Sequence, residues 1–139
     1  MAAAQASQIP LQLSRGCVIA SIQVDLTEDV ITRFQKDLLK YLHATRAIGL
    51  VIDVSGVEVI DREDFEALRR TMLMAEVMGA QVALSGLRAG VVSSLIGLGA
   101  DIDGVHGALN LDEAIDLVNE LKAEEEATIA DEGLNDLEG

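Results

Sequence analysis

The sequence predicts an α/β fold in which a mixed β-sheet opens with an N-terminal β-hairpin and carries about four helices packed on one side, in the order ββαβαβαβα. Half of the 139 residues are apolar, so the chain can close a single core. Short runs rich in β-branched residues alternate with longer segments whose apolar residues recur at helical spacing. Two short runs come first with no helix between them, and the later strand–helix alternation is typical of parallel strands.

The first third of the chain is expected to form the hairpin and one helix. Residues 9–14 and 17–25 alternate loosely in polarity around Arg15-Gly16, a pair that suits a tight turn. From Thr27 onward the apolar period becomes helical, and the Thr27 hydroxyl is a suitable N-cap. The expected buried side of this helix comprises Val30, Phe34, Leu38, Tyr41 and Leu42.

The middle of the chain predicts two further strands around a second helix. Residues 47–54 are apolar on consecutive positions, which is typical of a parallel strand covered on both faces. The helix is expected to begin at Asp61, whose carboxylate caps it, and to end at Gly79. Residues 81–85 form the next strand. The expected buried side of the helix comprises Phe65, Leu68, Met72 and Ala75.

The remaining elements are a short helix, an edge strand and a final helix. The short helix stops at Gly97-Leu98-Gly99, and residues 105–109 predict a weak edge strand. The last helix covers residues 111–123, after which the apolar period fades. The side chains expected to point inward are Val91, Val92, Leu95 and Ile96 in the short helix, and Ala114, Ile115, Leu117, Val118 and Leu121 in the last.

The predicted organisation is a flexible N-terminus at residues 1–8, one domain at 9–123 and an acidic C-terminal tail at 124–139. The formal net charge of −14 argues against partners such as nucleic acid or an anionic membrane surface, because both bind clustered basic residues. No run reaches the roughly 18 apolar residues of a membrane-spanning helix, and the N-terminus lacks a secretory pattern. The single cysteine, Cys17, suits a reducing compartment. These features predict a soluble, cytoplasmic protein.

The residue patterns of enzymes and metal sites are missing from the sequence. Its two histidines, His43 and His106, belong to different expected elements, which argues against a metal cluster. The segment Gly97-Leu98-Gly99 lacks the third glycine of a dinucleotide-binding turn, and no phosphate-binding loop or nucleophile elbow occurs. We therefore expect no catalytic residue, no cofactor and no metal, and a domain that acts by binding other proteins.

Polar residues gather where the expected strands pass into helices. Asp53 and Ser55 end the central strand, Asp61 and Asp64 open the next helix, and Ser85 ends the neighbouring strand. Such turns fall on one edge of a parallel sheet, where a phosphorylated serine would interact with helix dipoles and exposed amides. The alternative is that Ser55 and Ser85 are ordinary turn and cap residues. The predicted partner-binding or switch region comprises Asp53, Ser55, Asp61, Arg62, Glu63, Asp64 and Ser85.

Three segments resemble the STAS domain family, the fold of the anti-sigma-factor antagonists. Residues 52–61, with the sequence Ile-Asp-Val-Ser-Gly-Val-Glu-Val-Ile-Asp, resemble the signature of the family. Residues 77–88 follow at the distance that the family shows, and residues 91–99 look like its third helix. The likeness extends from residue 9 to about residue 123 and is strongest to the stand-alone stressosome proteins of the RsbS type.

The resemblance implies a STAS fold and a non-enzymatic scaffold. Proteins of the RsbS type co-assemble with RsbR-like STAS domains into a large particle, the stressosome. That particle sequesters an RsbT-like serine/threonine switch kinase and regulates the general stress response. The implied partners are therefore RsbR-like STAS proteins and an RsbT-like kinase, in a large homo- or hetero-oligomer.

One position departs from the family. Where the resemblance places the phosphorylated serine of RsbS-like proteins, this chain has Arg62, which cannot accept phosphate. The second phosphosite of RsbR-like domains falls on Ser85, which becomes the phosphorylation candidate. Three interpretations compete: a permanently unphosphorylated scaffold, a fixed negative charge supplied by Glu63 and Asp64, or an artificial change of the site. We favour the scaffold, with Ser85 as the residual switch.

Two other functions stay open from the sequence. One is an anti-sigma-factor antagonist that binds an anti-sigma kinase directly, although it would normally need the missing serine. The other is a small-ligand or nucleotide-binding STAS domain that uses Asp53, Asp61 and Ser85, although no glycine-rich phosphate loop supports it.

Overall fold

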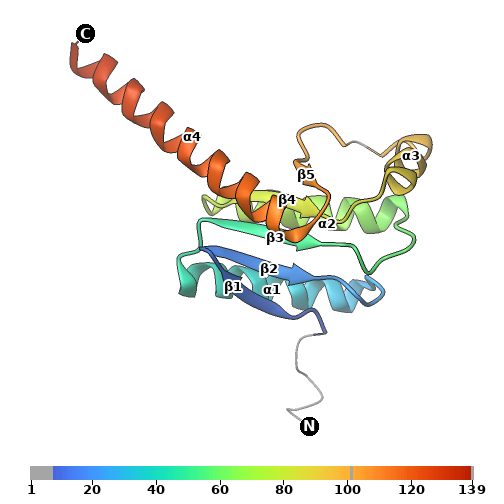
Figure 1. Ribbon diagram of the computed structural model, residues 1–139. Helices are drawn as coiled ribbons and strands as arrows, with labels where there is room; N and C mark the ends of the chain where they lie inside the picture. Colours follow the sequence, from blue (N-terminus) through green and yellow to red (C-terminus); the bar gives the residue numbers. More distant parts are fainter. Residues whose placement is uncertain (1–7, 101, 139) are drawn as a thin grey trace.

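A computed structural model describes residues 8–100 and 102–138 of the chain. Five strands form one mixed sheet in the order β1-β2-β3-β4-β5, with β1 antiparallel to β2 and the other neighbours parallel (Figure 1). The strands are β1 Leu11–Ser14, β2 Cys17–Ser21, β3 Gly49–Asp53, β4 Gln81–Ser85 and β5 Gly107–Ala108. The helices are α1 Glu28–Thr45, α2 Arg62–Val77, α3 Ala89–Gly97 and α4 Leu111–Glu138. The predicted α/β class and element order are confirmed.

Local chemistry sets the turns and the helix starts as the sequence predicts. Both central residues of the β1–β2 turn have positive φ, 49° at Arg15 and 81° at Gly16, as a tight two-residue hairpin requires. The Thr27 hydroxyl accepts the N–H of Val30 at 3.3 Å and caps α1. Residues 1–7, most of the expected flexible N-terminus, lie outside the described residues.

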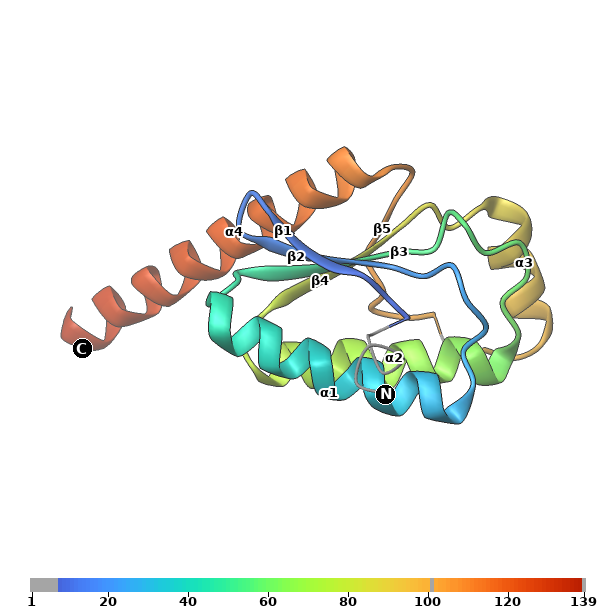
Figure 2. The same ribbon diagram turned by 90° about the horizontal axis from the view of Figure 1, so that it is seen from below.

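The helices cover both faces of the sheet, so the prediction that all of them pack on one side is wrong. Helices α1 and α2 lie against one face, and α4 lies against the other (Figure 2). The cluster under α4 contains Cys17, Ile19, Val51, Ala83, Ala114, Ile115 and Val118. The reason is that β2, β3 and β4 are buried on consecutive residues, so each of their two faces needs a cover.

A glycine allows α4 to sit close to the sheet. A Cβ on Gly49, the first residue of β3, would overlap the side chain of Val118 and would lie 2.8 Å from the Gln81 carbonyl oxygen. Because no Cβ is present, Val118 packs directly over the backbone of β3 and is fully buried. This contact joins residues that are far apart in the sequence.

The expected bounds of the last elements need correction. Helix α4 continues to Glu138 rather than ending at residue 123, because alanine, glutamate and leucine, which favour helix without tertiary contacts, recur in this segment. Strand β5 is shorter than the predicted 105–109. In α3, Leu95 is buried as expected, whereas Ile96 is 57% exposed. Among the described residues, no helix has the length and apolar character that crossing a bilayer requires.

Candidate functional site

The carboxyl ends of β3 and β4 lie side by side and bring three of the predicted site residues together. Asp53 and Ser85 are partners in the register of the two strands. The Ser85 hydroxyl donates to Oδ1 of Asp53 at 2.9 Å, and the Ser55 hydroxyl donates to Oδ2 at 3.1 Å. The backbone N–H of Ser55 also donates to Oδ1, at 3.2 Å. One carboxylate therefore holds both serines.

The two serines differ in accessibility. Ser85 is fully buried, whereas Ser55 is exposed. Gly86 allows the two turns to lie close together, because its φ is +77° and a Cβ there would lie 2.8 Å from the backbone nitrogen of Ser55. The N–H of Val54 donates to the Ser85 carbonyl at 2.9 Å and completes the link. The Ser85 hydroxyl can reach solvent only if this connection between the two strand ends opens.

A second group of site residues lies at the start of α2. The Asp61 carboxylate accepts the N–H of Asp64 at 2.8 Å, which confirms the predicted N-cap. Arg62 is half exposed and pairs with Glu66 at 3.0 Å. Its Nη1 lies 3.8 Å from the position that a Cβ on Gly99 would take, so the guanidinium reaches the residues that follow α3.

The charge of Arg62 is unfavourable for the helix that it opens. A cation in the first turn of a helix opposes the helix dipole, and an arginine that precedes glutamate by four residues is the weaker orientation of such a pair. The Glu66 contact offsets part of this cost. Helix stability therefore does not account for an arginine at this position.

Acidic side chains crowd the same turn. The pKa of Asp64 is raised from its ordinary value, first because partial burial penalises the charged carboxylate and then because Asp61, Asp25 and Glu63 repel it. Glu63 itself is exposed. Together with Arg62, these carboxylates give the edge a mixed charge.

The seven predicted residues thus form two groups, and within residues 8–100 and 102–138 no hydrogen bond or ion pair joins one group to the other. Between them runs the loop that follows β3, which lines a groove of about 300 Å³ with the start of α3. Val59 in this groove is 78% exposed. Val59 was not among the site residues predicted from the sequence, because its exposure depends on how the loop is placed.

The side chains at this edge of the sheet suit contact with another protein and modification of a hydroxyl group. His43 lies in the last turn of α1, near the amino end of β3 and away from the two serines. In the part of the chain that the structure describes, no three histidine, cysteine or acidic side chains are grouped to hold a metal ion. The edge therefore offers a buried hydroxyl, a shared carboxylate and an exposed mixture of charged and apolar side chains.

The fold and this edge define a class of small α/β domain that is built like the anti-sigma-factor antagonists. The sequence profile of the STAS domain matches residues 8–114, and the chain belongs to the STAS domain family. The resemblance carried by residues 52–61, 77–88 and 91–99 is thereby confirmed. No curated protein sequence matches the chain.

Solved structures add more specific likenesses. An RsbS variant from Moorella thermoacetica with a serine-to-glutamate substitution is 29% identical, with a TM-score of 0.71, over 83% of this chain and 97% of that one. A structure reported for the molecular architecture of the stressosome is 28% identical, with a TM-score of 0.71, over 81% and 97%. The unphosphorylated anti-sigma factor antagonist SpoIIAA, a Bacillus protein, shares the fold at 12% identity and a TM-score of 0.59, over 80% and 97%.

Proposed function

We propose that this protein is a cytoplasmic, non-enzymatic stressosome scaffold of the RsbS type. It co-assembles with RsbR-like STAS domains and sequesters an RsbT-like serine/threonine kinase, and so regulates the general stress response. The observation that carries the proposal is the likeness to RsbS and to a stressosome structure over nearly the whole length of those chains. The edge of the sheet at the carboxyl ends of β3 and β4, together with the start of α2, is here called the carboxyl edge. It adds support, because it presents exposed charged and apolar groups that suit a protein contact.

We assign Arg62 to a contact with the partner that does not depend on phosphorylation. It stands where RsbS-like proteins have a phosphorylated serine, it is half exposed, and its charge does not help α2. Its ion pair with Glu66 is solvent-exposed and therefore weak, so the guanidinium can exchange it for an acidic group of a partner. We propose that this fixed charge holds the kinase without regulation by phosphate at this turn.

Ser85 is the phosphoacceptor in this proposal, and its burial gives the modification a structural consequence. The hydroxyl is fully buried and bonded to Asp53, so the kinase must open the turn before it can transfer phosphate. A phosphate next to the Asp53 carboxylate would repel it and break the link to Ser55. Modification would then keep the strand ends apart and change the surface presented to partners.

Light scattering after size exclusion tests the scaffold. We expect particles far above the 14.8 kDa chain mass, either alone or with an RsbR-like STAS protein. Kinase binding is then compared by calorimetry for Arg62→Glu and for Lys36→Glu, which makes the same charge change at an exposed position of α1. We expect Arg62→Glu to weaken binding about tenfold and Lys36→Glu to leave it unchanged. Monomer under both conditions would reject the scaffold.

Mass spectrometry after incubation with a cognate RsbT-like kinase and Mg-ATP tests the phosphoacceptor. We expect phosphate on Ser85, none in residues 61–64, and none anywhere in the Ser85→Ala variant. Phosphate on Ser55 or Thr71 would show that the assignment is wrong.

A further inference from the structure

The sheet has an open edge at β5. This strand is last in the sheet order, and it pairs with β4 through the N–H of Leu84 to the His106 carbonyl at 2.9 Å and the N–H of Gly86 to the Ala108 carbonyl at 3.1 Å. In a parallel ladder successive residues face opposite sides, so the peptide groups of Gly107 and Leu109 point away from β4. Leu109 is 81% exposed. This edge can hydrogen-bond to another extended chain.

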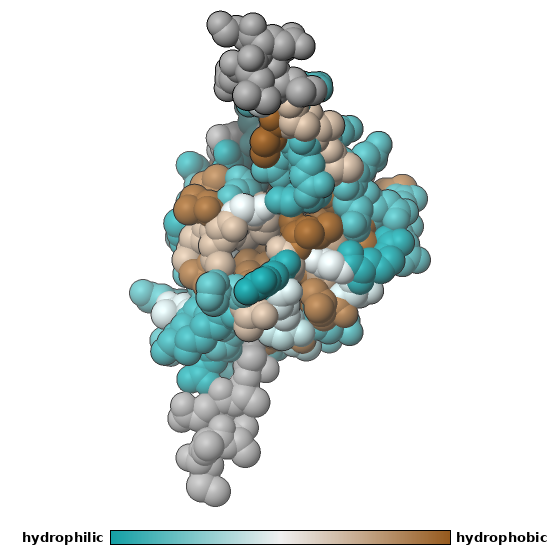
Figure 3. Space-filling model, turned by 90° about the vertical axis from the view of Figure 1, so that its left-hand side faces the viewer, coloured by the Kyte–Doolittle hydropathy of each residue, from teal (hydrophilic) through white to brown (hydrophobic). Residues whose placement is uncertain are grey.

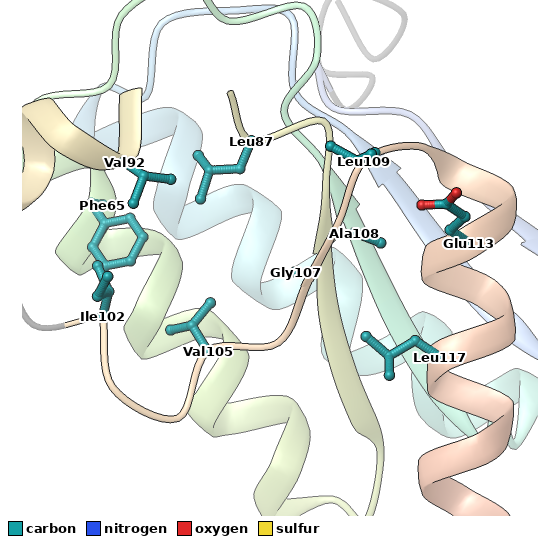
Figure 4. Close-up of a pocket in the computed structure, with 10 residues that line it drawn as sticks. All are labelled: Phe65, Leu87, Val92, Ile102, Val105, Gly107, Ala108, Leu109, Glu113 and Leu117. Atoms are coloured by element: carbon teal, nitrogen blue, oxygen red, sulfur yellow. The ribbon is translucent and has the colours of Figure 1, made fainter. Parts of the chain in front are cut away.

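A groove of about 500 Å³ follows this edge. Phe65 of α2 and Leu117 of α4 both line it, although these two helices cover opposite faces of the sheet. Figure 4 shows the chain through Gly107 running between the side chains of Phe65 and Val105 on one side and Leu117 on the other. The two layers of helix therefore flank the last strand and leave a mainly apolar slot along it.

The shape of the slot matches an added β-strand. Side chains of a strand alternate between its two faces, so those of an added strand would meet Phe65 and Val105 on one face and Leu117 on the other. The backbone would bond to the free groups of Gly107 and Leu109. This is recognition by strand addition, in which backbone bonds provide affinity and alternate side-chain pockets provide specificity.

Charge selects the occupant. Glu113 is exposed at the rim of the slot, and its carboxylate points toward Leu109 and Ala108 (Figure 4). The β5 edge of a second copy carries the same Glu113 carboxylate, which disfavours pairing between two β5 edges. We propose that the β5 edge binds an extended segment of a different protein, with apolar residues at alternate positions and a lysine or arginine facing Glu113. This surface adjoins the carboxyl ends of β3 and β4, because Ala108 pairs with Ser85, but none of the seven residues of the predicted switch region lines it. The proposal does not depend on kinase binding at those residues.

The probe is a synthetic acetyl-Lys-Val-Lys-Val-Lys-Val-amide peptide, followed by amide hydrogen exchange and by calorimetry on the full chain. We expect slower exchange at Gly107 and Leu109 when the peptide is bound. Leu109→Pro removes the outward N–H at an exposed edge position that tolerates proline, and it should weaken binding about tenfold. Leu109→Ala, the matched control, keeps that N–H and should bind within about twofold of the parent.

Glu113→Lys gives an independent readout that leaves the edge backbone unchanged. It should reverse the preference, so that the peptide with glutamate in place of lysine binds more tightly. Unchanged exchange at Gly107 and Leu109, or equal binding by the proline and alanine variants, would overturn the proposal. Dissociation of homo-oligomers by Leu109→Pro without peptide would assign the edge to contacts between copies, which also contradicts it.

Discussion

At the end of β4, Gly86 adopts a φ of +77°, and its Cα faces the backbone of Ser55 at a distance that leaves no room for a side chain. Gly79, after α2, also has positive φ, +92°, but a Cβ there would contact nothing within 4 Å. A side chain at Gly79 would therefore meet only the strain of positive φ, whereas a side chain at Gly86 would meet that strain and a steric overlap with Ser55. Of these two glycines, Gly86 is the one that lies at the candidate site.

We predict that Gly86→Ala lowers the free energy of unfolding by about 3 kcal/mol, whereas Gly79→Ala lowers it by about 1 kcal/mol. Both variants carry the strain of positive φ, and the alanine at position 86 adds the overlap with Ser55. Urea unfolding of the two variants and the parent measures the difference. Equal losses would mean that the two strand ends are not held together as described.

The raised pKa of Asp64 gives a pH-dependent prediction. Because its pKa is higher in the folded than in the unfolded state, folding takes up a proton between the two values, and stability falls as pH rises through that interval. Asp64→Asn should therefore be more stable than the parent at pH 7, and its advantage should shrink toward about pH 4, near the ordinary pKa of aspartate. Urea unfolding at several pH values measures this advantage, with Glu63→Gln as the exposed control. A constant advantage would contradict the prediction.

Among the elements, α4 divides into a packed half and a projecting half. Its packed half begins at an Asn110 cap, whose side chain accepts the N–H of Glu113 at 2.9 Å. Farther along α4, Lys122 donates to the Gly79 carbonyl at 3.1 Å, and Glu125 accepts from Gln81 at 3.1 Å. Residues 126–133 are exposed, and the helix projects from the body (Figure 1).

We predict that a chain ending at Glu125 unfolds with a free energy within about 0.5 kcal/mol of the full chain, because residues 126–133 are all exposed. A chain ending at Leu117 lacks the buried Val118 and should lose about 3 kcal/mol or more. Urea unfolding followed by circular dichroism compares the two. A large loss on removal of residues 126–139 alone would show that the projecting half packs against the domain.

For the whole molecule, exposed apolar side chains and a high net charge have opposite effects on association between copies of the chain. Val77 and Met78, at the end of α2, are 89% and 44% exposed. The side of the molecule from which α4 projects carries apolar patches among hydrophilic residues (Figure 3). Burial of such patches favours association, and the net charge of −14 opposes it between identical chains.

We predict that the average mass of the protein in sedimentation rises as salt increases from about 0.02 M to about 0.3 M, because screening weakens the repulsion between copies. The chain ending at Glu125 has lost several acidic residues and should depend less on salt. Sucrose in place of salt is the control, since it does not screen charge. A fall in mass with added salt would indicate that association depends on attraction between opposite charges.

Much of the fold could be predicted because its signals act over a few residues. The Thr27 and Asp61 caps, the hairpin turn at Arg15-Gly16 and the bounds of β4 all agree with the expectations from sequence. The residues of the candidate site could be predicted from the sequence, but their arrangement in space could not. Ser85 was assigned to the correct strand end, whereas its burial depends on Gly86 and Asp53, which meet it only in the folded chain.

The sequence by itself determined which segments become strands or helices, where the hairpin and caps lie, and that the chain carries a STAS domain, because periodicity, turn residues and motif spacing are local properties. The tertiary structure decided that α4 covers the second face, that one serine is buried while the other is exposed, and that a slot opens beside β5. These features depend on contacts such as Gly49 with Val118, and on Phe65 and Leu117 lining one groove. A linear pattern does not specify the distance between residues that meet only after packing.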